Sequence, residues 1–217
     1  DARGFSTLLS AYSSSSFQLS RSLSMNVGIN SQFFSLYKHV TLEPRVGFRY
    51  QWKPTHSVGV AYGLHSRLER LNYYFNNSLA TGETAVNKNL DFTKAHHLVL
   101  SYDWAISDVA HLRMEPYYQS LFSVPVMLGS SFSLLNVQND WFFAEKLQNA
   151  GAGRNYGVDI TLEKYLSKGY YYLLTGSLFS SEYKGGDGVW RNTRFNRNFV
   201  ANFLFGKEWQ LGNEHQN

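Results

Sequence analysis

The fold is decided by the stretch Tyr156-Gly157-Val158-Asp159-Ile160-Thr161-Leu162-Glu163-Lys164-Tyr165-Leu166, in which apolar residues recur at every second position. One face is interrupted only by Lys164 and otherwise consists of Tyr156, Val158, Ile160, Leu162 and Leu166. Successive side chains of a strand point to opposite faces, whereas the 3.6-residue period of a helix would mix the two sets. The stretch therefore predicts a β-strand with one apolar and one mostly polar face.

The same alternation recurs along the chain, most clearly at 23–33, 42–52 and 199–209. With boundaries uncertain by a few residues, it predicts about nine strands, near 5–20, 22–36, 40–52, 56–73, 94–107, 110–124, 155–167, 170–183 and 196–210. Many of these are longer than the five or six residues typical of soluble sheets, and they reach the length that a tilted membrane strand needs.

Composition narrows the class of protein. Charged and aromatic residues each make up 17% of the 217 residues, and mean hydropathy is −0.33. No window of about 18 apolar residues exists, which excludes a helical membrane protein. The absence of cysteine excludes a disulfide scaffold and thiolate chemistry. The net charge of +4 is spread without a Lys/Arg run, so we expect no nucleic-acid partner. A secreted β-sandwich has similar statistics, so composition leaves sandwich and barrel open.

The predicted connections alternate between short and mostly long. Four short ones, at 20–21, 53–55, 107–109 and 167–169, alternate with 37–39 (itself short), 74–93, 125–154 and 184–195. Outer-membrane β-barrels have short periplasmic turns and longer outer loops. This sorting favours a transmembrane barrel, because a soluble meander has no reason to place every short turn on one side.

Aromatic residues give an independent indication. Trp52, Trp104, Tyr170 and Trp209 adjoin the short turns, whereas Phe33, Tyr73, Tyr118 and Phe122 lie towards the long loops. Two such groups are typical of the aromatic girdles at the two lipid–water boundaries. The alternative is that they form the core of a sandwich. Since three signals agree, we interpret the chain as an all-β, antiparallel, transmembrane β-barrel segment.

The polar faces of the predicted strands carry charged side chains that we expect to point into the barrel lumen, where water or a plug domain satisfies them. They are Glu43, Arg45, Arg49, Arg67, Arg113, Glu115, Glu163 and Glu208. The alternative reading of Glu115 and Glu163 as a catalytic pair of carboxylates is weaker, because as many cations share the surface.

Enzymatic and metal-binding readings have little support. His97, Ser101 and Asp103 share a face, but residues four apart on a strand are separated by roughly 13 Å, too far for a serine–histidine hydrogen bond. The adjacent His96 and His97 point to opposite faces, so they do not chelate one ion. We expect no enzyme activity, no metal and no cofactor.

The long loops are where a rigid barrel would hold a ligand. Aromatic and basic residues there are the candidate ligand contacts: Trp141, Phe143, Trp190, Arg191 and Arg194. The alternative, equally open for any one of them, is that they pack loops against each other.

The run from Asn149 to Asp159 (NAGAGRNYGVD), continuing through 162–164 and 169–175, resembles the barrel of TonB-dependent outer-membrane receptors. Nearest is the branch with an N-terminal carboxypeptidase-regulatory-like domain, which the run 187–196 (DGVWRNTRFN) also fits, as do 206–209, 42–45, 87–92 and 117–119. The single motifs are modest, but their order and spacing cover nearly the whole chain.

The resemblance implies part of a 22-stranded barrel in the outer membrane of a Gram-negative bacterium. It would import a scarce nutrient of the ferric siderophore, cobalamin or glycan class with energy from TonB-ExbB-ExbD. We interpret residues 1–217 as a partial barrel domain without the plug, the TonB box and the final strands. The expected partners are outer-membrane lipid, the protein's own plug, the TonB complex through the missing N-terminal parts, and a small-molecule, chelate or glycan ligand. A passive porin or adhesin barrel is the alternative.

Overall fold

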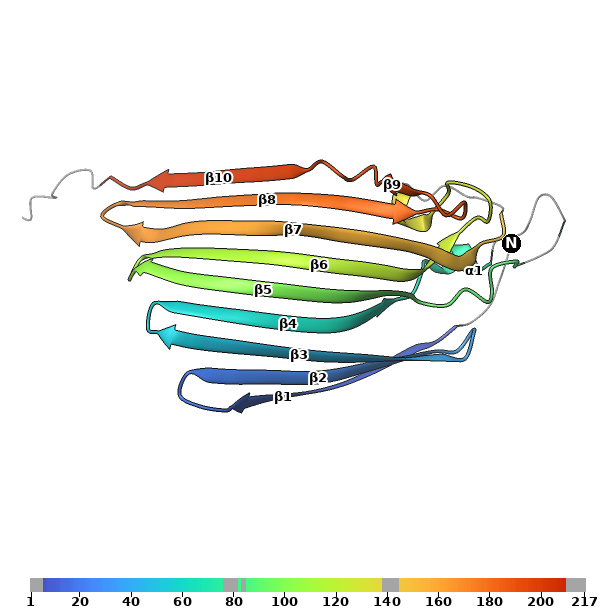
Figure 1. Ribbon diagram of the computed structural model, residues 1–217, viewed down its shortest axis with the longest axis horizontal. Coiled ribbons are helices and arrows are strands. Elements are labelled where there is room, and N and C mark those ends of the chain that lie inside the picture. Colours follow the sequence, from blue (N-terminus) through green and yellow to red (C-terminus); the bar gives the residue numbers. More distant parts are fainter. Residues whose placement is uncertain (1–5, 76–81, 83–84, 138–144, 210–217) are drawn as a thin grey trace, which may run out of the picture.

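One antiparallel sheet dominates the computed structural model, which describes residues 6–75, 82, 85–137 and 145–209 (Figure 1). Within these residues ten strands follow the order β1 to β8 and then β10, and β9 pairs with the end of β8. Their bounds are Leu8–Gln18, Leu23–Phe34, His39–Lys53, His56–Arg67, Thr93–Ser107, Ala110–Val126, Gln148–Ser167, Tyr170–Lys184, Trp190–Asn192 and Phe199–Lys207. The sheet is open, with β1 and β10 as its two edges.

All nine predicted strands are present, and the differences have local causes. β4 ends at Arg67 rather than near 73, because Leu71–Tyr74 form the short helix α1. β7 begins at Gln148, where Gly151 and Gly153 interrupt the apolar alternation that the sequence prediction relied on. The three-residue β9 was not predicted. No helix among the described residues is long and apolar enough to cross a membrane.

The two ends of the sheet differ, as the connection lengths predicted. The connections 19–22, 54–55, 108–109 and 168–169 all lie at one end, on the left in Figure 1. The opposite end carries 35–38 and the longer segments 68–92, 127–147 and 185–198. At the turn after β7, Lys168 and Gly169 have φ values of 54° and 78°, as a two-residue type I′ hairpin requires.

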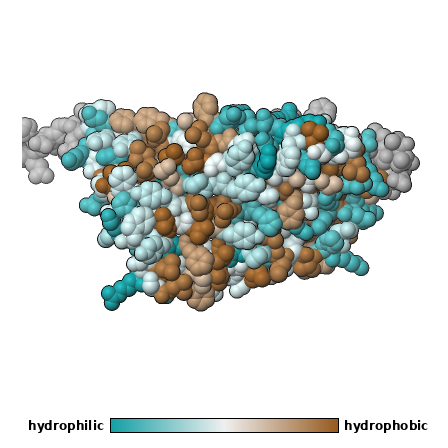
Figure 2. Space-filling view, in the orientation of Figure 1, coloured by the Kyte–Doolittle hydropathy of each residue, from teal (hydrophilic) through white to brown (hydrophobic). Residues whose placement is uncertain are grey.

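The strand register confirms the two faces. Directly opposed residues point to the same side of a sheet. The register of β5 and β6, with Val99 opposite Tyr117 and Tyr102 opposite Met114, also aligns Leu100 with Pro116. One row across the sheet is then entirely apolar: Met25, Phe48, Val60, Leu100, Pro116, Val158, Leu178 and Phe199. The faces alternate along each strand, so Arg49, Gly59, Ser101 and Asp159 lie on the polar side. In Figure 2 hydrophobic side chains gather along the strands, and hydrophilic ones predominate at the loop end.

A compact hydrophobic cluster lies at the long-loop end. We call it the cap; its buried members are Phe34, Tyr73, Tyr74, Leu90, Phe92, Leu134 and Leu147. They come from β2, α1, the segment 85–92, the 3₁₀ helix Leu134–Asn136 and the residue before β7. The prediction that Tyr73 belongs to an aromatic girdle is wrong, because α1 turns its side chain into this cluster, where it is 6% exposed.

Candidate functional site

The predicted lumenal side chains within the strands share the polar face of the sheet. Arg45 lies opposite Gly63, Arg49 opposite Gly59, and Arg113 opposite both Asp103 and Thr161. Alternation along β3, β4, β6 and β7 puts Glu43, Arg67, Glu115 and Glu163 on the same face. Glu208 follows the last residue of β10, and its backbone N–H donates to the carbonyl of Gly169 at 2.7 Å.

Asp103 is the centre of an ionic ladder on this face. Arg113 Nε donates to its Oδ1 at 2.7 Å, and an Arg49 guanidinium nitrogen lies 3.7 Å from Oδ2. His111 lies 3.5 Å from Asp103 and 3.5 Å from Glu163. The ladder links β3, β5, β6 and β7 near the short-turn end. Asp103 is only 7% exposed, and the hydrogen bond from Arg113 together with the nearby charge of Arg49 stabilises its carboxylate there.

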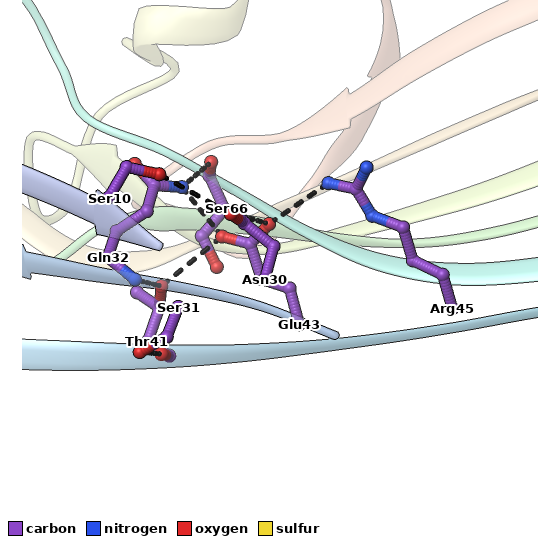
Figure 3. A network of polar contacts seen from close by, with 8 residues as sticks. All are labelled: Ser10, Asn30, Ser31, Gln32, Thr41, Glu43, Arg45 and Ser66. Carbon is purple, nitrogen blue, oxygen red and sulfur yellow. Dashed lines mark hydrogen bonds and ion pairs between the residues drawn. The ribbon is translucent and has the colours of Figure 1, made fainter. Parts of the chain in front are cut away.

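A second network is built around Glu43, near the loop end of β3. Although it is only 1% exposed, its carboxylate accepts hydrogen bonds from Asn30, Gln32, Thr41 and Arg45 at 2.7–3.3 Å (Figure 3). Gln32 also donates to the backbone carbonyl of Ser66 in β4, at 3.1 Å. A buried charge is tolerated only when it is paired and hydrogen-bonded, and here donors from β2 and β3 meet that need.

Between these networks the polar face has a recess of about 390 Å³. Its lining includes small residues on neighbouring strands, namely Gly28, Gly47, Ala61 and Gly63, together with Arg45, His65 and His97. A Cβ on Gly63 would lie 2.7 Å from His65 Nε2, so glycine there leaves room for the imidazole. The recess could accept another piece of polypeptide or a polar ligand.

The cap is tied together by two buried or half-buried asparagines. Asn87 donates to the carbonyl of Glu145 at 3.0 Å and accepts from the N–H of Leu147 at 2.8 Å. Asn149 accepts from the N–H of Asp91 and donates to the carbonyls of Asp91 and Ser123. These side chains replace backbone partners that irregular loops lack, so the segments 85–92 and 145–149 are fixed to each other.

Two ionisable groups of the cap have shifted pKa values. Burial raises the pKa of Tyr74 to about 12. Burial alone would also raise the pKa of Asp91, but hydrogen bonds from His39, the Phe92 N–H and Lys94 outweigh it and lower that pKa. Asp91 is therefore ionised and holds the junction between 85–92 and β5.

Three of the predicted ligand contacts fall within the described residues. Arg191 forms a two-pronged pair with Asp187 at 2.7 and 2.9 Å, which lowers the pKa of Asp187. Trp190 lies opposite Lys184, on the apolar-face side of β8, and its ring is 4.6 Å from the Arg154 guanidinium carbon. The backbone N–H of Arg194 donates to Asn136 at 2.7 Å. Trp141 and Phe143 lie outside the described residues.

The residues weighed in the sequence as a catalytic row have other partners in the structure. Asp103 pairs with Arg113, and His97 packs edge-on against His65 and Tyr117. Within the described residues no group of three or more His, Asp or Glu side chains could hold a metal ion. Sequence reasoning missed the asparagine ties of the cap, because their partners are backbone groups about 60 residues away.

Solved structures resemble this chain closely in fold and weakly in sequence. The ferripyoverdine receptor of the Pseudomonas aeruginosa outer membrane matches with a TM-score of 0.67 and 11% identity, over 94% of this chain and 26% of that one. The ferric-catecholate import receptor Fiu of Escherichia coli K12 gives 0.66 and 12%, over 92% and 32%. The alcaligin outer-membrane receptor FauA of Bordetella pertussis gives 0.62 and 15%, over 92% and 34%.

The fold is that of an outer-membrane receptor barrel. This confirms the predicted antiparallel barrel segment. The chain spans about a third or less of the receptors it matches. The matched proteins are receptors and transporters rather than enzymes by description. No protein-family model matches the sequence. No curated protein matches it either.

Proposed function

We propose that the chain is part of the barrel of a TonB-dependent receptor in the outer membrane of a Gram-negative bacterium. The observation that carries this is the pair of faces: apolar side chains stay exposed on one side of the sheet, while the other is lined by satisfied ionic networks. Such a sheet is stable in lipid with a hydrated lumen, and unstable as a soluble domain. The resemblance of the sequence to the branch with a carboxypeptidase-regulatory-like domain adds to the proposal.

The lumenal face would bind the receptor's own plug. The Asp103 ladder and the Glu43 network hold charged groups at fixed positions, and the recess beside Arg45 leaves backbone accessible. A plug that docks there would be rearranged by the TonB-ExbB-ExbD complex through segments outside this chain. No covalent chemistry is involved.

The outer loops would bind the nutrient. The cap gives these loops a fixed base: Arg194 contacts Asn136 in the 3₁₀ helix that contributes to it. Trp190 and Arg191 lie in the same segment, 185–198, and Trp141 and Phe143 are proposed from the sequence alone. Aromatic and guanidinium groups suit a ferric siderophore, cobalamin or glycan ligand. Several solved structures of the same fold are described as iron or siderophore receptors, so a ferric chelate is the first ligand to test.

The test is growth of the source bacterium on single sources of ferric siderophore, cobalamin or glycan, with the full-length receptor deleted or its TonB deleted. Loss of growth on one source in both deletions is expected. Growth that needs the receptor but not TonB would instead indicate a passive porin. Adhesion lost without any growth defect would indicate an adhesin. Either result would overturn the proposal.

A further inference from the structure

The lipid-facing side of the sheet has a stacked aromatic group at each end. At the short-turn end His56 stacks on Trp52 and Trp104, with ring centroids 5.6 and 5.7 Å apart, and its Nδ1 lies 3.0 Å from the Tyr102 hydroxyl. At the loop end His96 stacks between Tyr62 and Phe122.

The two groups delimit the apolar band of the sheet. The pairs His56–Trp104 and Leu64–His96 lie eight residues apart. That is about 27 Å along a strand, and about 20 Å along the membrane normal after a tilt of roughly 40°, comparable with the band of about 25 Å in outer-membrane barrels. The stack around His56 therefore lies at the periplasmic boundary.

Directly beside this stack, inside the band, is an apolar groove of about 540 Å³. It lies over two cross-strand rows, and its side-chain lining is Phe48, Tyr50, Val58, Val60, Leu100, Tyr102, Met114 and Pro116. Val60 lies between Phe48 and Leu100 in one row, and Val58 lies between Tyr50 and Tyr102 in the other. Because each valine side chain is shorter than both of its neighbours, β4 forms the floor of the groove, and β3 and β5 form its walls. An apolar groove of this volume beside the boundary can take part of a hydrocarbon chain.

The charge at this boundary is basic. Lys53 lies opposite His56, next to the groove. Farther along the same boundary Lys164 Nζ lies 3.6 Å from the centroid of the Tyr170 ring, and Lys207 Nζ lies 5.0 Å from that of Trp209. In the described strands, the lipid-facing positions of this end carry these three lysines and no Asp or Glu. Lysines beside aromatic rings at a membrane surface favour anionic headgroups.

We propose that the groove and the His56 stack bind one anionic glycerophospholipid of the periplasmic leaflet. An acyl chain lies along Val58 and Val60, and the headgroup phosphate lies near Lys53 and His56. The site is distinct from nutrient import: it rests on the proposed position in the outer membrane, and not on the ligand or on TonB. Lipid A belongs to the outer leaflet, whereas the short-turn end of the sheet lies at the periplasmic leaflet, so we do not expect lipid A to occupy this site.

The full-length receptor tests this after purification and delipidation in detergent, by titration with phosphatidylglycerol, phosphatidylethanolamine or lipid A and counting of bound lipid by native mass spectrometry. One phosphatidylglycerol is expected to remain bound. Val60→Phe, which fills the groove, weakens that binding at least about tenfold. Val158→Phe is the matched control, because Val158 has the same depth and face but lies outside the groove. Val60→Leu serves if the phenylalanine variant does not fold.

The charge is tested separately with Lys53→Gln, which should abolish the preference for phosphatidylglycerol over phosphatidylethanolamine. Lys168→Gln removes the same charge from another short turn and should leave it intact. Equal binding by Val60→Phe and the parent, equal losses in Val60→Phe and Val158→Phe, or a preference for lipid A would each overturn the proposal. A receptor that binds phosphatidylglycerol but imports nothing would overturn the proposed function alone.

Discussion

The cap and the sheet use the same apolar residue types in opposite ways. In the cap, Phe34, Tyr74 and Phe92 are at most 2% exposed. On the sheet, Phe199 and Phe203 are 66% and 69% exposed, and Leu178 is 59% exposed. The cap follows the rule of soluble proteins, in which burial removes apolar surface from water. The sheet follows the rule of a barrel, in which that surface meets lipid.

The difference in exposure indicates that the cap is surrounded by water and that the apolar face of the sheet is surrounded by lipid. The polar networks of the sheet lie on the side away from Phe199 and Phe203, whereas the polar groups of the cap bridge its loops from within. A cap with a core of its own does not depend on lipid for its order. Substitutions should therefore separate the two regions: those in the cap loosen loops, and those on the lipid face oppose insertion.

The largest effect is expected from Phe34→Ala. This residue packs against Tyr74 and Phe92, with ring centroids 5.5 and 6.5 Å away, and truncating a buried phenylalanine costs about 3–5 kcal/mol. Hydrogen–deuterium exchange of the full-length receptor in bilayers should speed up in peptides covering 85–92 and 127–137. Phe203→Ala, on the lipid side, is the control and should leave these peptides unchanged. Equal loop exchange in the two variants would mean that the cap has no independent core.

A charge on the lipid face should have the next largest effect. Phe199→Arg places a guanidinium in the mid-band row and should reduce folding stability in bilayers by about 2–4 kcal/mol. Val200→Arg is its neighbour on the opposite face, where it would adjoin Glu115 and Asp159, and should cost less than about 1 kcal/mol. Urea-dependent folding into vesicles measures both. A larger loss for Val200→Arg would reverse the assignment of the two faces.

Strand positions and faces could be predicted from the sequence, because alternation is local and each of the long strands carries it. The positions of Arg45, Arg49 and Arg113 on one side followed from parity alone. The partners of these arginines could not be predicted in this way, since pairing Arg113 with Asp103 requires the register between β5 and β6. The cap was missed because segments far apart in the sequence assemble it. For the same reason Tyr73, which fits the strand pattern locally, lies in α1 instead.

The side-chain hydrogen bonds of Asn87 should contribute to the order of the cap but not to that of the sheet. Asn87→Ala removes both the donor to Glu145 and the acceptor for Leu147, leaving backbone groups in the cap without a partner, at a cost of about 1–3 kcal/mol. The exposed Asn89 offers a control, and Asn89→Ala should change little. Limited proteolysis should cut within 85–92 faster in the first variant only. Protection that is identical in both variants would show that the tie is dispensable.

The smallest expected effect is the response of the cap to acid. The pKa of Asp91 is lower in the folded protein than its ordinary value of 3.8, so ionisation stabilises the cap at any pH above 3.8. That contribution is lost as the pH falls below 3.8 and through the pKa of the folded state, because Asp91 is then protonated in the folded protein as well and its carboxylate no longer favours folding. His39 and Lys94 are the side chains that face the carboxylate. Exchange of the peptide 85–92 should therefore exceed its intrinsic acid trend once the pH falls below 3.8, while peptides of β7 and β8 follow theirs. Asp91→Asn, which keeps an oxygen for the Phe92 N–H, should remove the excess. If the excess persists in that variant, another group of the cap titrates in its place.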